Sequence, residues 1–221
     1  MSVDKNAYQR IKSELDEHTV SLVAVSKTKP IDDIRVLYDL GQRDFGENYV
    51  QEMTEKAKQL PADIRWHFIG HLQTNKVRLI IPFVQLIHGV DSLRLLKEIN
   101  KEAGKAGKKI DCLLQVHIAD EETKFGFDEN ELLALDWNEI VSMSNVNVTG
   151  LMGMASFSDD LNKVRNEFQN LKKIFEKIQT ADLRFTTLSM GMSNDYQIAI
   201  EEGSTMVRIG SLLFGQRNQT S

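Results

Sequence analysis

The sequence predicts a closed α/β barrel, a (β/α)8 TIM barrel in which eight parallel strands alternate with helices. Eight short apolar runs alternate with segments whose apolar residues recur at helical spacing. The runs are nearly continuous, as in strands buried on both faces of a parallel sheet. No linker, low-complexity tract or separate C-terminal unit is visible, so a single domain over 1–221 is expected. An open doubly wound sheet is the alternative.

An extra helix is expected before the first strand. Tyr8, Ile11 and Leu15 fall on one stripe of an N-terminal segment that lacks the apolar centre of a signal peptide. Pro30 stands where the next helix can begin, and Gly41 where it ends. Strands are expected at residues 20–25, 43–45, 66–69, 83–88, 110–118, 146–151, 186–188 and 205–209.

Helix signals stand between these runs. Ser92 and Asp128 are expected N-caps, the second of a helix that runs to about Met143. A long helix carries apolar residues from Leu161 to Ile178. Further helices are expected near residues 31–41, 49–61, 72–81 and 194–202. The closing GSLLFG is interpreted as a loop after the last strand.

Composition limits the class of protein. The net charge of -5 disfavours nucleic acid as a partner. No apolar run approaches the ~20 residues that cross a bilayer, so no membrane association is expected. The one cysteine, Cys112, lies in the apolar run IDCLLQVHI and fills core. A reducing cytoplasm is consistent with this usage.

In such a barrel the site lies at the C-terminal ends of the strands. Lys27 follows the first strand directly, in SKTKP, and is expected at the rim of the mouth. A partly desolvated lysine there can act as an amine nucleophile toward an aldehyde. A solvated rim lysine is the alternative. Lys29 ranks second, because it precedes Pro30, where the chain turns outward.

The loops after the seventh and eighth strands often bind phosphate in these barrels. Ser189 and Ser193 in SMGMSND, and Ser211 after the last strand, offer hydroxyl groups. Gly191 and Gly210 let backbone amides approach an anion. Ordinary turn and capping chemistry is the alternative interpretation.

Arg208 stands inside the eighth apolar run, where a charge needs a partner. An acidic residue and a ligand atom in the barrel mouth are both possible partners. Asn48 follows the second strand in GENYVQE, next to Tyr49, and is a candidate for the mouth. His67 and His71 are four residues apart, but a strand ends between them, so a metal site is not expected.

Five segments resemble the pyridoxal phosphate homeostasis protein family (YggS/PROSC-like proteins). They are VAVSKTKP, RDFGENYVQE, WHFIGHLQTNK, TLSMGMSNDYQIAIEEGSTMVRIGS and LFG, and they extend from about Val20 to Gly215. Many relatives carry proline where this chain has His71, which should alter only the loop after the third strand.

The resemblance implies an alanine racemase N-terminal domain-like barrel that binds pyridoxal 5'-phosphate (PLP). It implies that Lys27 holds the cofactor as a Schiff base and that Arg208 faces the pyridine nitrogen. Phosphate contacts are implied for Ser189, Gly210 and Ser211, and Asn48 is placed near the cofactor. Because arginine only donates hydrogen bonds, the ring nitrogen should stay unprotonated, which disfavours carbanion chemistry.

The resemblance implies intracellular PLP homeostasis by buffering or delivery, with apo forms of PLP-dependent enzymes as candidate recipients and no known catalysed reaction. A weakly active amino-acid racemase is the alternative, although related racemases take a second base from a β-domain that this chain lacks. Tyr196 is a conceivable substitute base. A barrel enzyme acting on a phosphorylated sugar is the third hypothesis, and it predicts no bound chromophore. A monomer is expected.

Overall fold

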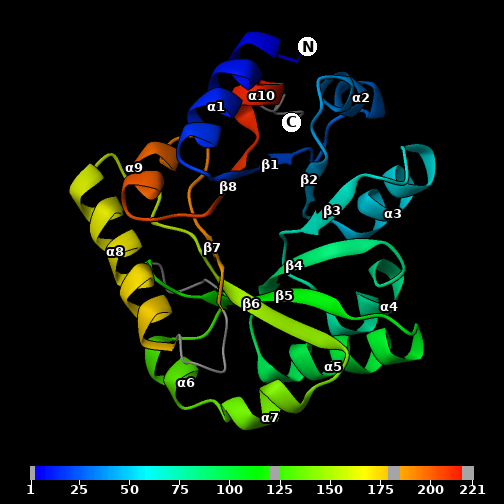
Figure 1. Cartoon of the computed structure of the whole chain (residues 1–221), viewed down its shortest axis with the longest axis vertical. Helices are drawn as coiled ribbons and strands as arrows, with labels where there is room; N and C mark the ends of the chain where they lie inside the picture. The colour runs from blue at the N-terminus through cyan, green and yellow to red at the C-terminus, as the bar shows by residue number, and fades with distance from the viewer. Residues whose placement is uncertain (1–2, 120–124, 179–184, 216–221) are drawn as a thin grey trace, which may run out of the picture.

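Eight parallel strands close into a barrel in the computed structural model, which describes residues 3–119, 125–178 and 185–215. Each strand pairs with its neighbours in chain order, and the last pairs with the first. Figure 1 shows the helices around the outside of these strands. The predicted barrel is therefore confirmed, and the open doubly wound sheet is wrong.

Each strand overlaps one of the apolar runs in the sequence. The strands are β1 (Ser21–Val25), β2 (Asp44–Glu47), β3 (Arg65–Phe68), β4 (Val84–Val90), β5 (Ile110–Val116), β6 (Val146–Gly153), β7 (Thr187–Ser189) and β8 (Met206–Ile209). The helices are α1 (Lys5–Glu17), α2 (Ile31–Asp39), α3 (Val50–Gln59), the 3-10 turn η1 (Thr74–Lys76), α4 (Val77–Ile80), α5 (Leu93–Lys105), α6 (Glu129–Leu133), α7 (Trp137–Ser142), α8 (Leu161–Ile178), α9 (Tyr196–Glu201) and α10 (Ser211–Phe214). Among the described helices, none combines the length and the apolar content that crossing a bilayer requires.

Two helical predictions need correction. The single helix expected from Asp128 to Met143 is two helices, because Asp136 accepts hydrogen bonds from the amides of Asn138 and Glu139 and starts α7 anew. The closing GSLLFG is not only a loop, since it contains α10.

The N-terminal helix α1 is confirmed and is tied to the end of the barrel. Asp4 caps it by accepting from the amide of Ala7, and Tyr8, Ile11 and Leu15 are buried. The Asp4 amide donates to the carbonyl of Leu213 at 2.9 Å. The helices α1 and α10 consequently lie side by side (Figure 1).

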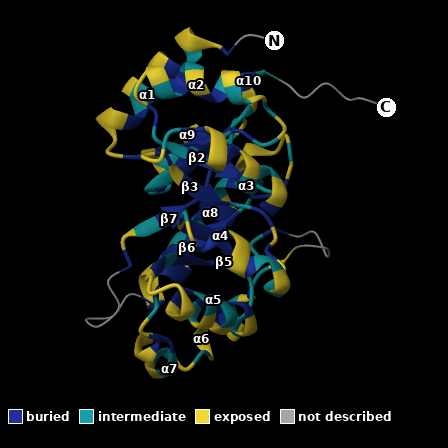
Figure 2. Ribbon diagram, turned by 90° about the vertical axis from the view of Figure 1, so that its right-hand side faces the viewer, coloured by how far each residue is buried: buried dark blue, intermediate teal, exposed yellow. Residues whose placement is uncertain are grey.

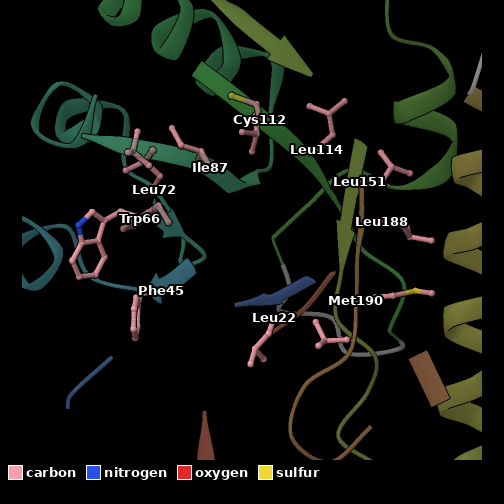
Figure 3. Packing of buried hydrophobic residues seen from close by; sticks show 14 of the residues in the cluster. Leu22, Phe45, Trp66, Leu72, Ile87, Cys112, Leu114, Leu151, Leu188 and Met190 are labelled. Carbon is pink, nitrogen blue, oxygen red and sulfur yellow. The ribbon is translucent and has the colours of Figure 1, made fainter. Parts of the chain in front are cut away.

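The buried residues form an outer shell between the strands and the helices and a separate barrel interior. Figure 2 shows the buried residues gathered around the strands, with the exposed ones on the outer helices. The shell receives side chains from all eight strands. Figure 3 labels part of it: Leu22, Phe45, Trp66, Leu72, Ile87, Cys112, Leu114, Leu151, Leu188 and Met190. Alternation along each strand turns the intervening residues inward, among them Val23, His67 and Arg208.

Candidate functional site

A cavity of about 390 Å³ lies at the C-terminal ends of the strands. Segments that follow β1, β2, β3, β6, β7 and β8 contribute to its wall. Its lining residues are Val25, Lys27, Lys29, Asn48, Ile69, Met154, Ala155, Ser156, Phe157, Met192, Ser193, Asn194, Asp195, Arg208, Gly210, Ser211 and Gly215. Five of the six residues proposed from the sequence are thus brought together, and Ser189 is the exception.

Lys27 is half-buried at the rim, where the chain leaves β1. The next residue, Thr28, has a left-handed backbone with φ = 63°, a conformation that is costly for a β-branched residue. The Thr28 amide donates to Oε1 of Glu52 at 2.6 Å. The loop that carries Lys27 is therefore held in an unusual conformation from one side.

A buried clamp of four residues, Ser26, Glu47, Glu52 and Lys56, holds this loop. Lys56 Nζ donates to the Ser26 carbonyl at 2.8 Å, to Glu47 at 2.8 Å and to Glu52 at 2.7 Å. The Ser26 hydroxyl donates to Glu47 at 2.6 Å. Burial raises the pKa of Glu47, although Lys56 and Ser26 favour its ionised form. Glu47 therefore supports the lysine loop.

Lys29 also lines the cavity, but its amine is hydrogen-bonded to two backbone carbonyls. Its Nζ donates to the carbonyl of Phe214 at 2.7 Å and to the carbonyl of Gly215 at 3.1 Å. These bonds tie the loop after β1 to the end of α10. Lys29 therefore joins two walls of the cavity.

Arg208 brings a buried positive charge to the floor of the cavity. Its side chain donates to Oγ of Ser189 at 2.6 Å and to the carbonyl of Gly153 at 3.0 Å. Burial lowers the pKa of Arg208 to about 10, with Asp195 acting in the opposite direction, so the guanidinium stays charged near neutral pH. In the part of the chain that the structure describes, no carboxylate forms an ion pair with it.

Ser189 does not line the cavity, so the lining gives no support to the phosphate contact implied for it. It is fully buried behind Arg208, and its Oγ lies 3.1 Å from Nδ1 of His88. As the last residue of β7 it points into the barrel interior, opposite Met206 on β8. Its partners make it a support for Arg208.

Ser193, Gly210 and Ser211 form a polar corner of the cavity. The Gly210 amide donates to Oγ of Ser193 at 3.3 Å, which joins the segments after β7 and β8. A Cβ on Gly210 would lie 3.3 Å from the Val25 carbonyl oxygen, tighter than ordinary contact. Glycine therefore lets this corner approach the strand that leads to Lys27.

Asn48 lines the cavity with an unsatisfied group. Its Oδ1 is buried and has no hydrogen-bond partner within the described residues. A Cβ on Gly70 would come within 2.3 Å of the Asn48 carbonyl oxygen, so close packing against Gly70 fixes the Asn48 backbone. An unpaired buried acceptor at a cavity wall favours a ligand that donates to it.

The segment after β6 is the wall that the sequence interpretation missed. Met154, Ala155, Ser156 and Phe157 line the cavity. Glu167 on α8 holds this segment, because it accepts from the Ser156 amide at 2.6 Å and from the Ser156 hydroxyl at 2.7 Å. The position directly after an apolar run was a usable signal, whereas the support from Glu167 was not visible in the sequence.

The two histidines around Gly70 have different surroundings. His67 lies in the barrel interior next to His88 and Asp44, whereas His71 stacks on Phe125 with a centroid distance of 3.9 Å. Within the described residues, no group of three or more metal-ligating side chains is assembled. Tyr49, the other candidate near the mouth, is exposed and does not line the cavity.

A family model described as "Alanine racemase, N-terminal domain" matches residues 4–218. Curated relatives carry the name pyridoxal phosphate homeostasis protein. The Pasteurella multocida protein is 40% identical over 207 residues, which cover 91% of this chain and 88% of the relative. The Homo sapiens protein is 40% identical over 210 residues, which cover 89% of this chain and 76% of the relative.

Solved structures show the same likeness. PipY of Synechococcus elongatus without PLP aligns with a TM-score of 0.90 and 36% identity, over 95% of this chain and 99% of PipY. PipY with PLP bound aligns with a TM-score of 0.84 and 34% identity, over 95% and 100%. An alanine racemase of Clostridium difficile aligns over 99% of this chain and 59% of its own, with a TM-score of 0.77 and 14% identity, a likeness of fold alone.

Proposed function

The chain belongs to the alanine racemase N-terminal domain family, and from that premise we propose that it binds pyridoxal 5'-phosphate in the cavity at the barrel mouth. One observation carries the proposal: a single cavity is lined by an amine, by a buried guanidinium with no ion-pair partner in the described chain, and by a Gly/Ser corner. PLP offers an aldehyde, a ring nitrogen and a phosphate to match them. The PLP-bound PipY structure and the names of the curated relatives point the same way.

Lys27 is the proposed covalent anchor. As a neutral amine, its Nζ forms a carbon-nitrogen double bond to the aldehyde carbon, and one water leaves. The buried clamp supports this choice, because it fixes the backbone on both sides of Lys27. Lys29 is disfavoured, since its amine already donates to two carbonyls.

The remaining contacts follow from the chemistry of the cavity wall. Ser193, Gly210 and Ser211 hold the phosphate, with Ser193 taking the place that the sequence assigned to Ser189. Asn48 contributes the buried acceptor Oδ1. Arg208 donates to the ring nitrogen and keeps it unprotonated, so the site favours holding the cofactor over stabilising a carbanion.

We propose a role in intracellular PLP buffering and delivery, with apo forms of PLP-dependent enzymes as recipients. The curated relatives are named for homeostasis and not for a reaction. The substitute base considered for a racemase, Tyr196, does not line the cavity, and its hydroxyl donates to Glu14 on α1 at 2.9 Å. A single domain over 1–221, a monomeric state and a cytoplasmic location stay predictions.

The test is a visible spectrum of the protein with PLP, followed by borohydride reduction and mapping of the modified peptide. We expect a visible absorption band and a pyridoxyl adduct on Lys27. A Lys27→Met variant should lose both, whereas Lys29→Met should keep the adduct on Lys27. A colourless protein without an adduct would refute the proposal, and an adduct on Lys29 would refute the choice of anchor.

A further inference from the structure

Five polar side chains form a continuous hydrogen-bonded series through the barrel interior, which we call the polar chain. Its links join Asp44 Oδ1 to His67 Nε2 at 3.0 Å, His67 Nδ1 to His88 Nε2 at 3.0 Å, His88 Nδ1 to Ser189 Oγ at 3.1 Å, and Ser189 Oγ to Arg208 Nη1 at 2.6 Å. The members come from β2, β3, β4, β7 and β8. The series therefore crosses the barrel and ends on the residue at the cavity floor.

The two ends of the polar chain fix its direction. Arg208 can only donate hydrogen bonds, so Ser189 Oγ accepts from it. Asp44 sits at the other end, where its carboxylate also accepts two hydrogen bonds from Arg65, at 2.7 and 2.5 Å. Burial opposes its ionisation, but the bonds from Arg65 and His67 prevail and lower its pKa to about 2. Asp44 is thus an ionised acceptor.

Only one arrangement of protons satisfies every link with neutral imidazoles. His67 donates from Nε2 to Asp44, so its Nδ1 accepts from Nε2 of His88. The Nδ1 of His88 then accepts the proton of the Ser189 hydroxyl. Burial, together with the charge of Arg208, lowers the pKa of His88 well below its ordinary value, in agreement with a neutral His88 ring.

Such an arrangement is unusual in a barrel interior, where branched apolar side chains normally pack. A buried polar series is stabilising only when every member is satisfied, and a gap in it is costly. Here the series is complete, and its last member lines the cavity. The complete series therefore fixes the Arg208 guanidinium in place at the cavity.

We propose that Asp44, His67, His88 and Ser189 are positioning residues that hold Arg208 toward the cavity and leave its donor groups directed at the ring nitrogen of the ligand. The inference rests on the proposed function, since it assigns a role in the same site. It adds four residues that do not line the cavity. It also predicts that a change at Asp44, on the far side of the barrel, is felt at the ligand.

The first test needs no ligand. Nitrogen-15 NMR of the histidines in the protein without PLP at pH 7.5 should show His67 and His88 as neutral rings protonated on Nε2. Assignment comes from His67→Gln and His88→Gln spectra. An Asp44→Ala variant should lose this single pattern and show mixed tautomers. A doubly protonated His67, or a proton on Nδ1 of His88, would overturn the inference.

The second test measures the ligand. In Ser189→Ala, Arg208 loses one charge-assisted hydrogen bond, so PLP affinity should fall about tenfold. The pH midpoint of the visible band should shift as well, because the donor opposite the ring nitrogen is no longer fixed. Asp44→Ala should move both quantities in the same direction by a smaller amount. Ser204→Ala is the matched control, since Ser204 is a buried serine whose hydroxyl, among the described residues, bonds only to the carbonyls of Leu188, Met190 and Met206.

The outcomes separate this inference from the proposed function. Binding by the unsubstituted protein with no change in Ser189→Ala and Asp44→Ala would refute the polar chain and leave PLP binding intact. Equal effects of Ser189→Ala and Ser204→Ala would also refute it, because a general loss of packing would then explain both. If the unsubstituted protein bound no PLP, the proposed function would fail, and the histidine spectra would still decide whether the polar chain has this direction.

Discussion

The outer shell and the barrel interior are both buried, yet they are built from different chemistry. The shell is one continuous apolar cluster that runs from α1 to α10 and surrounds every strand. The interior contains a small apolar cluster of Leu86, Leu113 and Met152. Beside it lie the buried polar residues His67, His88, Ser189 and Arg208.

This difference separates stability from function. Apolar burial in the shell contributes roughly 25 cal/mol per Å² without regard to direction, so it stabilises the barrel but specifies no ligand. The polar interior is directional, because each donor must meet an acceptor. The apolar shell can thus stabilise the barrel, while the polar interior supports a site at the C-terminal ends of the strands.

The largest expected effect belongs to the shell. Phe168 on α8 is fully buried, and Phe168→Ala should lower the free energy of unfolding by about 3–5 kcal/mol. The control is Phe157→Ala, since Phe157 is 87% exposed at the cavity rim and should change stability by less than about 0.5 kcal/mol. Urea unfolding followed by circular dichroism measures both. Similar losses in the two variants would contradict the shell as the source of stability.

Breaking the clamp that holds the Lys27 loop should cause the second largest loss in the free energy of unfolding. Lys56→Met leaves Glu47 buried without its cation, which should cost about 3 kcal/mol in urea unfolding. The loop should also loosen, and hydrogen exchange of the Thr28 amide should become faster. Lys58→Met is the control, because within the described part of the chain Lys58 forms only an exposed pair with Glu55, worth about 0–1 kcal/mol. Unchanged hydrogen exchange of the Thr28 amide would show that the clamp does not hold the loop that carries Lys27.

The acid end of the polar chain should give a pH-dependent effect. The pKa of Asp44 is lowered to about 2 in the folded chain, so its contribution is present above the unfolded pKa near 4 and is lost as the pH falls toward 2. Between pH 5 and pH 2 the free energy of unfolding of the unsubstituted protein should fall by about 2 kcal/mol more than that of Asp44→Asn. This value is an upper bound, because Asp44 is partly exposed. Urea titrations at several pH values measure the difference. Parallel pH profiles would show that Asp44 is not a coupled acceptor.

The smallest expected effect on stability comes from truncating Cys112, a residue of the shell, to alanine. Cys112 is fully buried, and burial raises the pKa of its thiol, so it should stay unreactive toward thiol reagents until the protein unfolds. Cys112→Ala should cost about 1 kcal/mol in urea unfolding, because no strong hydrogen bond is lost. Ser189→Ala removes a single oxygen atom but should cost more, since it removes the partner of Arg208 Nη1 and of His88 Nδ1 inside the barrel. Equal costs would erase the distinction between the two layers.

Local pattern was enough for much of the fold. The spacing of Tyr8, Ile11 and Leu15 predicted α1, and apolar runs predicted the strands, because helix and strand periodicities are written in consecutive residues. The split between α6 and α7 was missed, since Asp136 had to be weighed as a second cap within one apolar pattern. Position after the strands likewise predicted that Lys27, Asn48, Gly210 and Ser211 would lie at the mouth, and the structure adds Arg208 from within β8.

Residue pattern alone predicted the barrel, its eight strands and most of the loops that surround the mouth, the segment after β6 excepted. Three contacts became visible only in the folded chain: Ser189 supports Arg208 from behind, Glu47 and Lys56 hold the lysine loop, and two histidines join Ser189 to Asp44. They were hidden because a strand fixes only which face a side chain takes, whereas the partner of that side chain depends on register and stagger between strands far apart in the chain.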